Sequence, residues 1–92
     1  MLRRLHCSIS GRVQGVSFRF FVKQEAERLN CVGTVRNCPD DTVEVVAEGQ
    51  ERNIKMLVAA LEKGTDYSRV ERVAAKRESV EKTHFSDFKI IY

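Results

Sequence analysis

Two glycines and an arginine lie close together near the start of the chain, in the segment from Gly11 to Arg19, which reads GRVQGVSFR. Gly11 and Gly15 permit backbone conformations that a Cβ would obstruct, so successive N–H groups can turn inward around an anion. The segment joins an alternating pattern to a helical one, and the start of a helix attracts anions through its dipole. Arg19, in the first helical turn, can donate two parallel hydrogen bonds to phosphate oxygens. The segment therefore predicts a phosphate-binding loop.

The elements that position this loop follow from the spacing of the apolar residues. Residues 5–9 alternate between apolar and polar, which predicts a strand with one buried face. From Phe18 onward the apolar residues recur at spacings of four, four and three, which predicts a helix that ends near Asn30 and Gly33. The remaining segments are predicted as strand 34–38, a turn at Pro39-Asp40-Asp41, strand 42–48 interrupted by Gly49, a helix around residues 54–61 closed by Gly64, strand 69–76 and a final strand 88–92.

This order of elements predicts an α+β fold of the ferredoxin-like βαββαβ type, with a short strand added at the end. We expect an antiparallel sheet covered on one face by two helices, in a single domain spanning residues 1–92. The first two strands are joined by a helical crossover, so they run parallel, and the loop after Val13 and the strand end at Asn37 emerge at the same edge. With one strand between them, their axes lie about 10 Å apart, which leaves room for a phosphate and one water.

Both segments at this edge resemble motifs of the acylphosphatase family. GRVQGVSFR resembles the phosphate-cradle motif of that family, and GTVRNCPDDTVEV, residues 33–45, resembles its second motif, which ends a strand in a catalytic asparagine. The similarity of plan spans essentially the whole chain. It implies an enzyme that hydrolyses the carboxyl–phosphate bond of small acyl phosphates to a carboxylate and inorganic phosphate, with no cofactor.

The resemblance also implies a role for each residue of the site. Arg19 and the backbone N–H groups of Gln14, Gly15, Val16, Ser17 and Phe18 would hold the phosphoryl group, and the Asn37 amide would position the attacking water. No strong base is needed, because a carboxylate is a good leaving group and phosphoryl transfer depends mostly on positioning and charge stabilisation. The Gln14 side chain is equally consistent with lining the cradle or facing solvent.

Two residues depart from the family pattern, because Ser17 and Asp41 stand where it ordinarily has glycine. We favour a positive φ at Ser17, which would strain the cradle. The alternative is a negative φ, with the Ser17 hydroxyl capping the helix. Asp41 is expected to adopt the left-handed conformation in its turn, with consequences for stability rather than for chemistry.

Other reactive side chains are interpreted as structural. Cys7, Cys31 and Cys38 form an odd set without short paired spacing, so we expect free thiols in a reducing compartment and no metal site. Cys38 is expected to be a small core residue rather than a nucleophile. His6 is interpreted as a histidine on the sheet face rather than a general base, and Arg36 is assigned no role.

The formal charge of +3, from 16 basic and 13 acidic residues, favours a small anionic substrate and falls short of a nucleic-acid footprint. No apolar run reaches membrane length, so we expect a cytoplasmic monomer that binds neither membrane nor nucleic acid.

Two alternative functions stay open. An RNA-recognition domain has the same element order, although residues 5–9 lack aromatics and Glu44 and Glu48 would repel a phosphate backbone. A regulatory domain that senses a small anion would use the same cradle.

Overall fold

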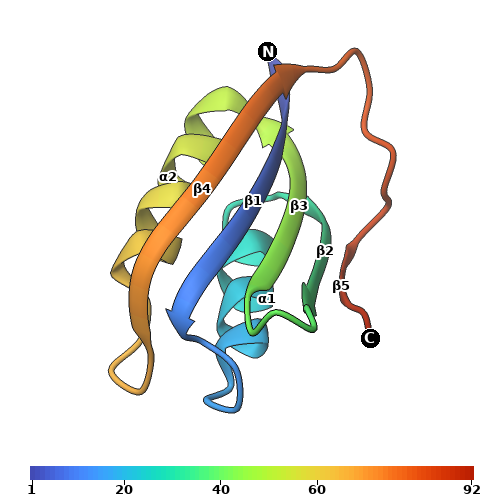
Figure 1. Cartoon of the computed structure of the whole chain (residues 1–92). Helices are drawn as coiled ribbons and strands as arrows, with labels where there is room; N and C mark the ends of the chain where they lie inside the picture. Colours follow the sequence, from blue (N-terminus) through green and yellow to red (C-terminus); the bar gives the residue numbers. More distant parts are fainter.

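The computed structural model describes all 92 residues and contains five strands and two helices, with both helices on one face of the sheet (Figure 1). In chain order they are β1 (Leu2–Arg12), α1 (Phe18–Arg28), β2 (Val32–Asn37), β3 (Val43–Gln50), α2 (Glu51–Lys63), β4 (Arg69–Ser79) and β5 (Phe88–Ile90). The predicted ferredoxin-like order of elements is therefore confirmed. Neither helix is long and apolar enough to cross a membrane.

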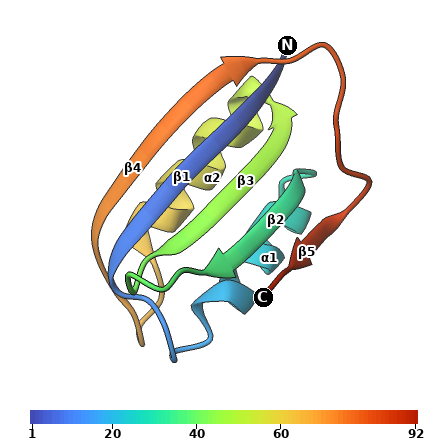
Figure 2. The ribbon, with the colours of Figure 1, turned by 45° about the vertical axis from the view of Figure 1, so that its right-hand side comes forward.

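The strands form one sheet in the order β4-β1-β3-β2-β5. Strand β3 lies between β1 and β2 and is antiparallel to both, as predicted. Strands β1 and β2 therefore run in the same direction, and their C-terminal ends lie at the same end of the sheet. The four strands β4-β1-β3-β2 are antiparallel to their neighbours, as predicted, and the added terminal strand β5 pairs with β2 in parallel. The chain after β4 crosses to the opposite edge of the sheet before β5 begins, and so enters β5 in the same direction as β2 (Figure 2).

The core lies between the sheet and the two helices. The inward face of β1 carries the alternating residues that the sequence predicts to be buried, and each helix buries its predicted apolar stripe. The central fully buried side chains are Leu5, Ile9, Phe18, Val22, Val35, Val45, Ile54, Leu57 and Leu61. The apolar stripe of α1, formed by Phe18, Val22 and Ala26, is buried against the sheet. This burial, rather than helix propensity alone, fixes the position of α1 and of the loop that precedes it.

Several predicted boundaries differ from the structure. Strand β2 ends at Asn37, so Cys38 lies outside it and is half-buried, and the prediction that Cys38 belongs to the core is wrong. Gly49 does not interrupt β3, which continues to Gln50. A Cβ at Gly49 would lie 3.0 Å from the Cys31 sulfur, so glycine serves there for close packing rather than to end the strand.

The other cysteines and His6 lie where the sequence predicts. All three thiols are free, and burial raises the pKa of Cys7 to about 12 and that of Cys31 to about 11. Neither thiol is therefore suited to act as a thiolate nucleophile. On the open face of the sheet, the His6 imidazole and the Arg36 guanidinium both contact the Glu44 carboxylate, at 3.1 and 2.7 Å. His6 and Arg36 are therefore each paired with Glu44 on this face.

Candidate active site

The loop between β1 and α1 is fixed at both ends by buried side chains. Val13 and Phe18 are each 1% exposed, and between them the chain bends through positive φ at Gly15 (74°) and Ser17 (60°). The backbone N–H groups of residues 14–17 donate no hydrogen bond within the protein. A run of free N–H groups immediately before a helix is an anion-binding arrangement, because the helix dipole reinforces it.

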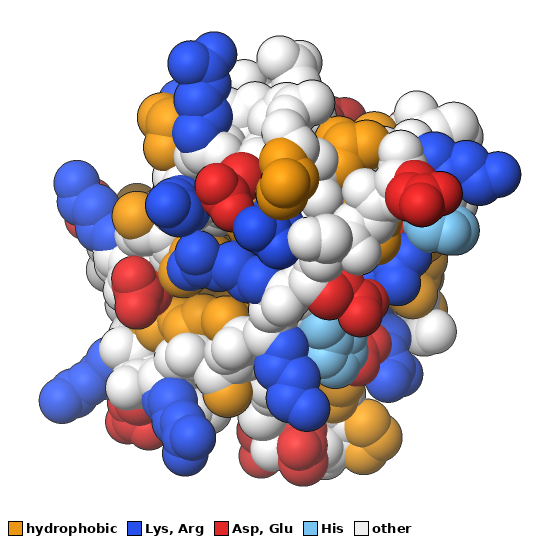
Figure 3. Space-filling model, turned by 90° about the horizontal axis from the view of Figure 1, so that it is seen from above, with side chains coloured by type: hydrophobic (Ala, Val, Ile, Leu, Met, Phe, Trp, Pro, Cys, Tyr) orange, Lys and Arg blue, Asp and Glu red, His pale blue; other side chains and the backbone are white.

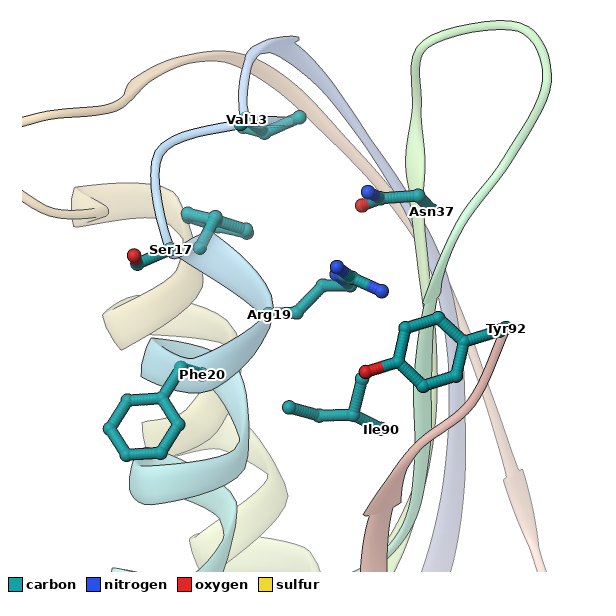
Figure 4. Close-up of a pocket in the computed structure, with 9 residues that line it drawn as sticks. Val13, Ser17, Arg19, Phe20, Asn37, Ile90 and Tyr92 are labelled. Atoms are coloured by element: carbon teal, nitrogen blue, oxygen red, sulfur yellow. The ribbon is translucent and has the colours of Figure 1, made fainter.

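Arg19 is the charged residue of this arrangement. It lies in the first turn of α1, and its side chain extends across the cavity toward β2 (Figure 4). It forms no ion pair with any carboxylate, and its guanidinium lies over the Tyr92 ring, with Cζ 5.0 Å from the ring centroid. The planar fork of guanidinium donors is therefore available to an anion.

Asn37 lies opposite Arg19 at the end of β2, where its backbone pairs with Val43. The Asn37 amide points toward Arg19 (Figure 4), and its Oδ1 is buried without a hydrogen-bond partner. Buried polar atoms are nearly always hydrogen-bonded in native proteins, so an orphaned acceptor requires an explanation. An acceptor held in this position can orient a water molecule.

Arg19 and Asn37 line one cavity of about 350 Å³, as the topology predicts. Its lining residues are Val13, Gly15, Ser17, Phe18, Arg19, Phe20, Asn37, Ile90 and Tyr92. Of the predicted phosphate-binding residues, Gln14 and Val16 do not line it. The sequence did not point to Ile90 and Tyr92, although the alternation in the final strand was visible, because nothing local shows that this strand pairs with β2.

The Gln14 side chain neither lines the cavity nor faces solvent freely. Its Nε2 donates to the backbone carbonyls of Cys38 and Thr42, both at 2.9 Å, so it joins the loop to the turn that follows Asn37. These two bonds connect the segments that carry the free N–H groups and the orphaned amide oxygen. The Gln14 side chain therefore links the β1–α1 loop to the turn after Asn37 and does not itself face the cavity.

Comparison with known proteins agrees with this geometry. The acylphosphatase family model matches residues 5–90 of the chain. The chain belongs to the acylphosphatase family. It is 39% identical over 92 residues to an acylphosphatase of Clostridium acetobutylicum, covering all of both chains, and 44% identical over 84 residues to one of Bacillus licheniformis, covering 91% and 92%. The crystal structure of the Bacillus subtilis acylphosphatase superimposes with a TM-score of 0.91 at 36% identity over all of both chains. Acylphosphatases are hydrolases, and the chain is an enzyme of that class.

The two departures from the acylphosphatase pattern both have the left-handed conformation that favours glycine. Ser17 has a φ of 60° and makes no side-chain capping bond, so the favoured positive φ is confirmed and the capping alternative is wrong. Asp41 has a φ of 70°, as expected. The neighbouring Asp40 accepts from the Thr42 hydroxyl and N–H, which lowers the pKa of its carboxyl. The turn is thus held by Asp40, while Asp41 bears the strain.

The C-terminal segment reaches the acylphosphatase site because a buried carboxylate holds the connection before β5. The Glu48 side chain is fully buried and accepts from the backbone N–H of His84 and from Arg4 Nε at 2.9 Å. Burial alone would raise the pKa of Glu48, but the bonds from His84 and Arg4 outweigh it and lower that pKa. Residues 80–87 are therefore anchored at His84 on their way to Ile90 and Tyr92.

No group of three or more His, Cys, Asp or Glu side chains lies together in a way that could hold a metal ion. The positive charge at the cavity comes from Arg19 and from the free N–H groups of the loop. Phosphoryl groups can be bound by such preorganised donors.

Proposed function

We propose that this acylphosphatase hydrolyses small acyl phosphates, and that Arg19 together with the backbone N–H groups of residues 14–18 binds the phosphoryl group while Asn37 orients the attacking water. The observation that carries this proposal is the buried, unpartnered Asn37 Oδ1 in the same cavity as an arginine without an ion pair. One group is an acceptor for water and the other a donor to phosphate, so their tasks are complementary.

The reaction follows from these two positions. The phosphoryl oxygens accept from the Arg19 fork and the loop N–H groups, which neutralise the charge that spreads over them in the transition state. A water that donates to Asn37 Oδ1 attacks phosphorus in line with the departing carboxylate. The bond from phosphorus to the acyl oxygen breaks, that oxygen leaves as part of the carboxylate, and the water proton goes to the phosphate or to solvent. A strong protein base is not required, because the leaving group is weakly basic.

The decisive experiment is release of inorganic phosphate from acetyl phosphate, measured for the wild type and for Asn37→Ala. Arg52→Lys is a matched control for substitutions at Arg19, because Arg52 is an exposed arginine on α2 outside the catalytic cavity. Phosphate binding without any turnover would favour the anion-sensing alternative instead. Turnover should survive exhaustive chelation, and a reproducible requirement for added Mg²⁺ would contradict the proposed use of protein donors alone.

The proposal extends to the location, the oligomeric state and the partners of the protein. We expect a cytoplasmic monomer, a single domain that acts on a small substrate without nucleic acid. The RNA-binding alternative gains no support from the open face of the sheet, where Glu44 and Glu48 contact basic side chains and no aromatic residue of β1 or β3 is present.

A further inference from the structure

A second groove lies beside the catalytic cavity, on the other side of the loop that separates β1 from α1. It has a volume of about 530 Å³ and is lined by Arg12, Gly15, Val16, Ser17, Asp66 and Tyr67. It shares Gly15 and Ser17 with the catalytic cavity, but no residue of β2 or β5 contributes to it. The segment carrying Asp66 and Tyr67 joins α2 to β4, and the β1–α1 loop lies between that segment and β2 (Figure 1).

In the proposed reaction, in-line attack places the leaving group on the side of phosphorus where this groove lies. Water held at Asn37 attacks from the β2 side, so the acyl group departs on the side of phosphorus that faces away from β2. Gly15 lines both the catalytic cavity and the groove, and a Cβ built at Gly15 would meet no atom within 4 Å. The Ser17 side chain also points away from Arg19 and Asn37 (Figure 4).

The charges around this groove are not balanced within the fold. Arg12 forms no ion pair, and its cross-strand partner is Arg69, which forms none either. Like charges directly opposite each other on paired strands are unfavourable. Asp66 is the one acidic residue of the groove lining, and its carboxylate is not in an ion pair, so neither charged residue of the lining is neutralised by a partner within the fold. Tyr67 adds an aromatic ring that is 78% exposed.

We infer that this groove is the acyl subsite, and that Arg12 selects acyl phosphates whose acyl group carries a second anionic group. The Tyr67 ring packs against the carbon part of that acyl group, and Asp66 limits the preference by opposing the second charge. This inference rests on the proposed function, since it assigns the acyl end of the same substrate.

The test compares benzoyl phosphate with para-carboxybenzoyl phosphate, which differ only by a carboxylate. The wild type should have the higher kcat/KM for the carboxylated substrate, and Arg12→Gln should reduce that preference about fivefold, as expected for one partly exposed charge pair. Asp66→Asn should increase the preference. Tyr67→Ala should lower kcat/KM for both aromatic substrates. Acetyl phosphate, whose methyl group does not reach Arg12, should be hydrolysed normally by all three variants.

The control variant is Arg52→Gln, which removes the same charge from the N-terminal turn of α2, where Arg52 lines neither the catalytic cavity nor the groove. It should leave the preference unchanged. An unchanged preference in Arg12→Gln, or an equal reduction in Arg52→Gln, would overturn the assignment of Arg12, because a distant charge would then serve as well. If the wild type hydrolyses acetyl phosphate but shows no preference between the aromatic pair, the subsite is wrong and the proposed function stands. If the wild type hydrolyses none of the three substrates, the acyl subsite and the proposed function are both wrong.

Discussion

The polar side chains at one end of the sheet have hydrogen-bond and ion-pair partners within the chain, and those at the other end lack them. At the end opposite the site, Arg4 contacts both Glu48 and Glu78, and His84 completes the set of partners around the buried Glu48 carboxylate. Figure 3, which views the molecule from that end, shows basic and acidic side chains in mutual contact. At the site end, Arg12 and Arg19 have no carboxylate partner and Asn37 Oδ1 has no donor.

The contrast separates a structural use of charge from a functional one. Buried and half-buried polar groups stabilise a fold only when their partners are supplied, and an unsatisfied group costs free energy. The end around Glu48 supplies those partners from within the chain. The end around Asn37 supplies no partner to Asn37 Oδ1 or to Arg19, and in the proposed function a bound substrate and water supply them.

The strongest way to break this contrast is to remove the orphaned acceptor. Asn37→Ala should lower kcat by roughly two to three orders of magnitude, because the water loses its orienting group, while affinity for inorganic phosphate is retained. Steady-state kinetics and phosphate binding by calorimetry measure the two effects separately. If phosphate binding falls in parallel with kcat, Asn37 is a phosphate ligand and not the group that orients water.

Arg19→Lys should lower both phosphate affinity and turnover, by roughly tenfold or more, because a lysine cannot reproduce two parallel hydrogen bonds to the phosphate. The exposed Arg52→Lys variant should behave like the wild type in the same assays. Near-normal hydrolysis by Arg19→Lys would show that only a positive charge is needed at this position.

At the opposite end, Glu48→Gln should reduce stability by about 1–2 kcal/mol, because Arg4 and the His84 N–H lose a charged acceptor in a buried place. The pKa of Glu48 is lowered in the folded state, so its contribution is present above the ordinary pKa of 4.5 and is lost as the pH falls through the folded-state value. The stability of the wild type should therefore decline below about pH 4.5, and that of Glu48→Gln should decline less steeply.

Glu78→Gln is the control for Glu48→Gln, because Glu78 contacts the same arginine but its side chain is 63% exposed. Denaturant unfolding should show little change for Glu78→Gln, as is usual for exposed pairs. Equal destabilisation of the two variants would mean that the buried position of Glu48 is of no consequence.

The smallest effects concern the two strained residues. Asp41→Gly should increase stability by up to about 1 kcal/mol, because glycine adopts a φ of 70° without the Cβ penalty. Ser17→Gly should relieve strain in the same way and also tighten phosphate binding, because the neighbouring N–H groups can then approach the anion more closely. Unfolding midpoints and phosphate titrations of both variants check this difference. Tighter binding in Asp41→Gly as well would indicate a general stabilisation rather than an effect on the cradle.

What the sequence determined by itself was local. The strand pattern before Gly11, the glycines of the loop and the apolar stripe after Phe18 are each set by neighbouring residues, because backbone conformation and helical spacing act over a few positions. The crossover rule then brought Arg19 and Asn37 to one edge of the sheet without any knowledge of contacts.

Only the tertiary structure decided the remaining features, because they join residues that are far apart in the chain. The bonds from Gln14 span 24 and 28 positions and the pairing of Glu48 with His84 spans 36, and no local pattern indicates which side chains meet over such distances. The parallel pairing of β5, which brings Tyr92 to the face of Arg19, depends on where the connection after β4 is anchored. A long-range contact forms only when packing places both partners together. The residues that we propose to carry the chemistry were therefore readable from the sequence, and those that hold them in position were not.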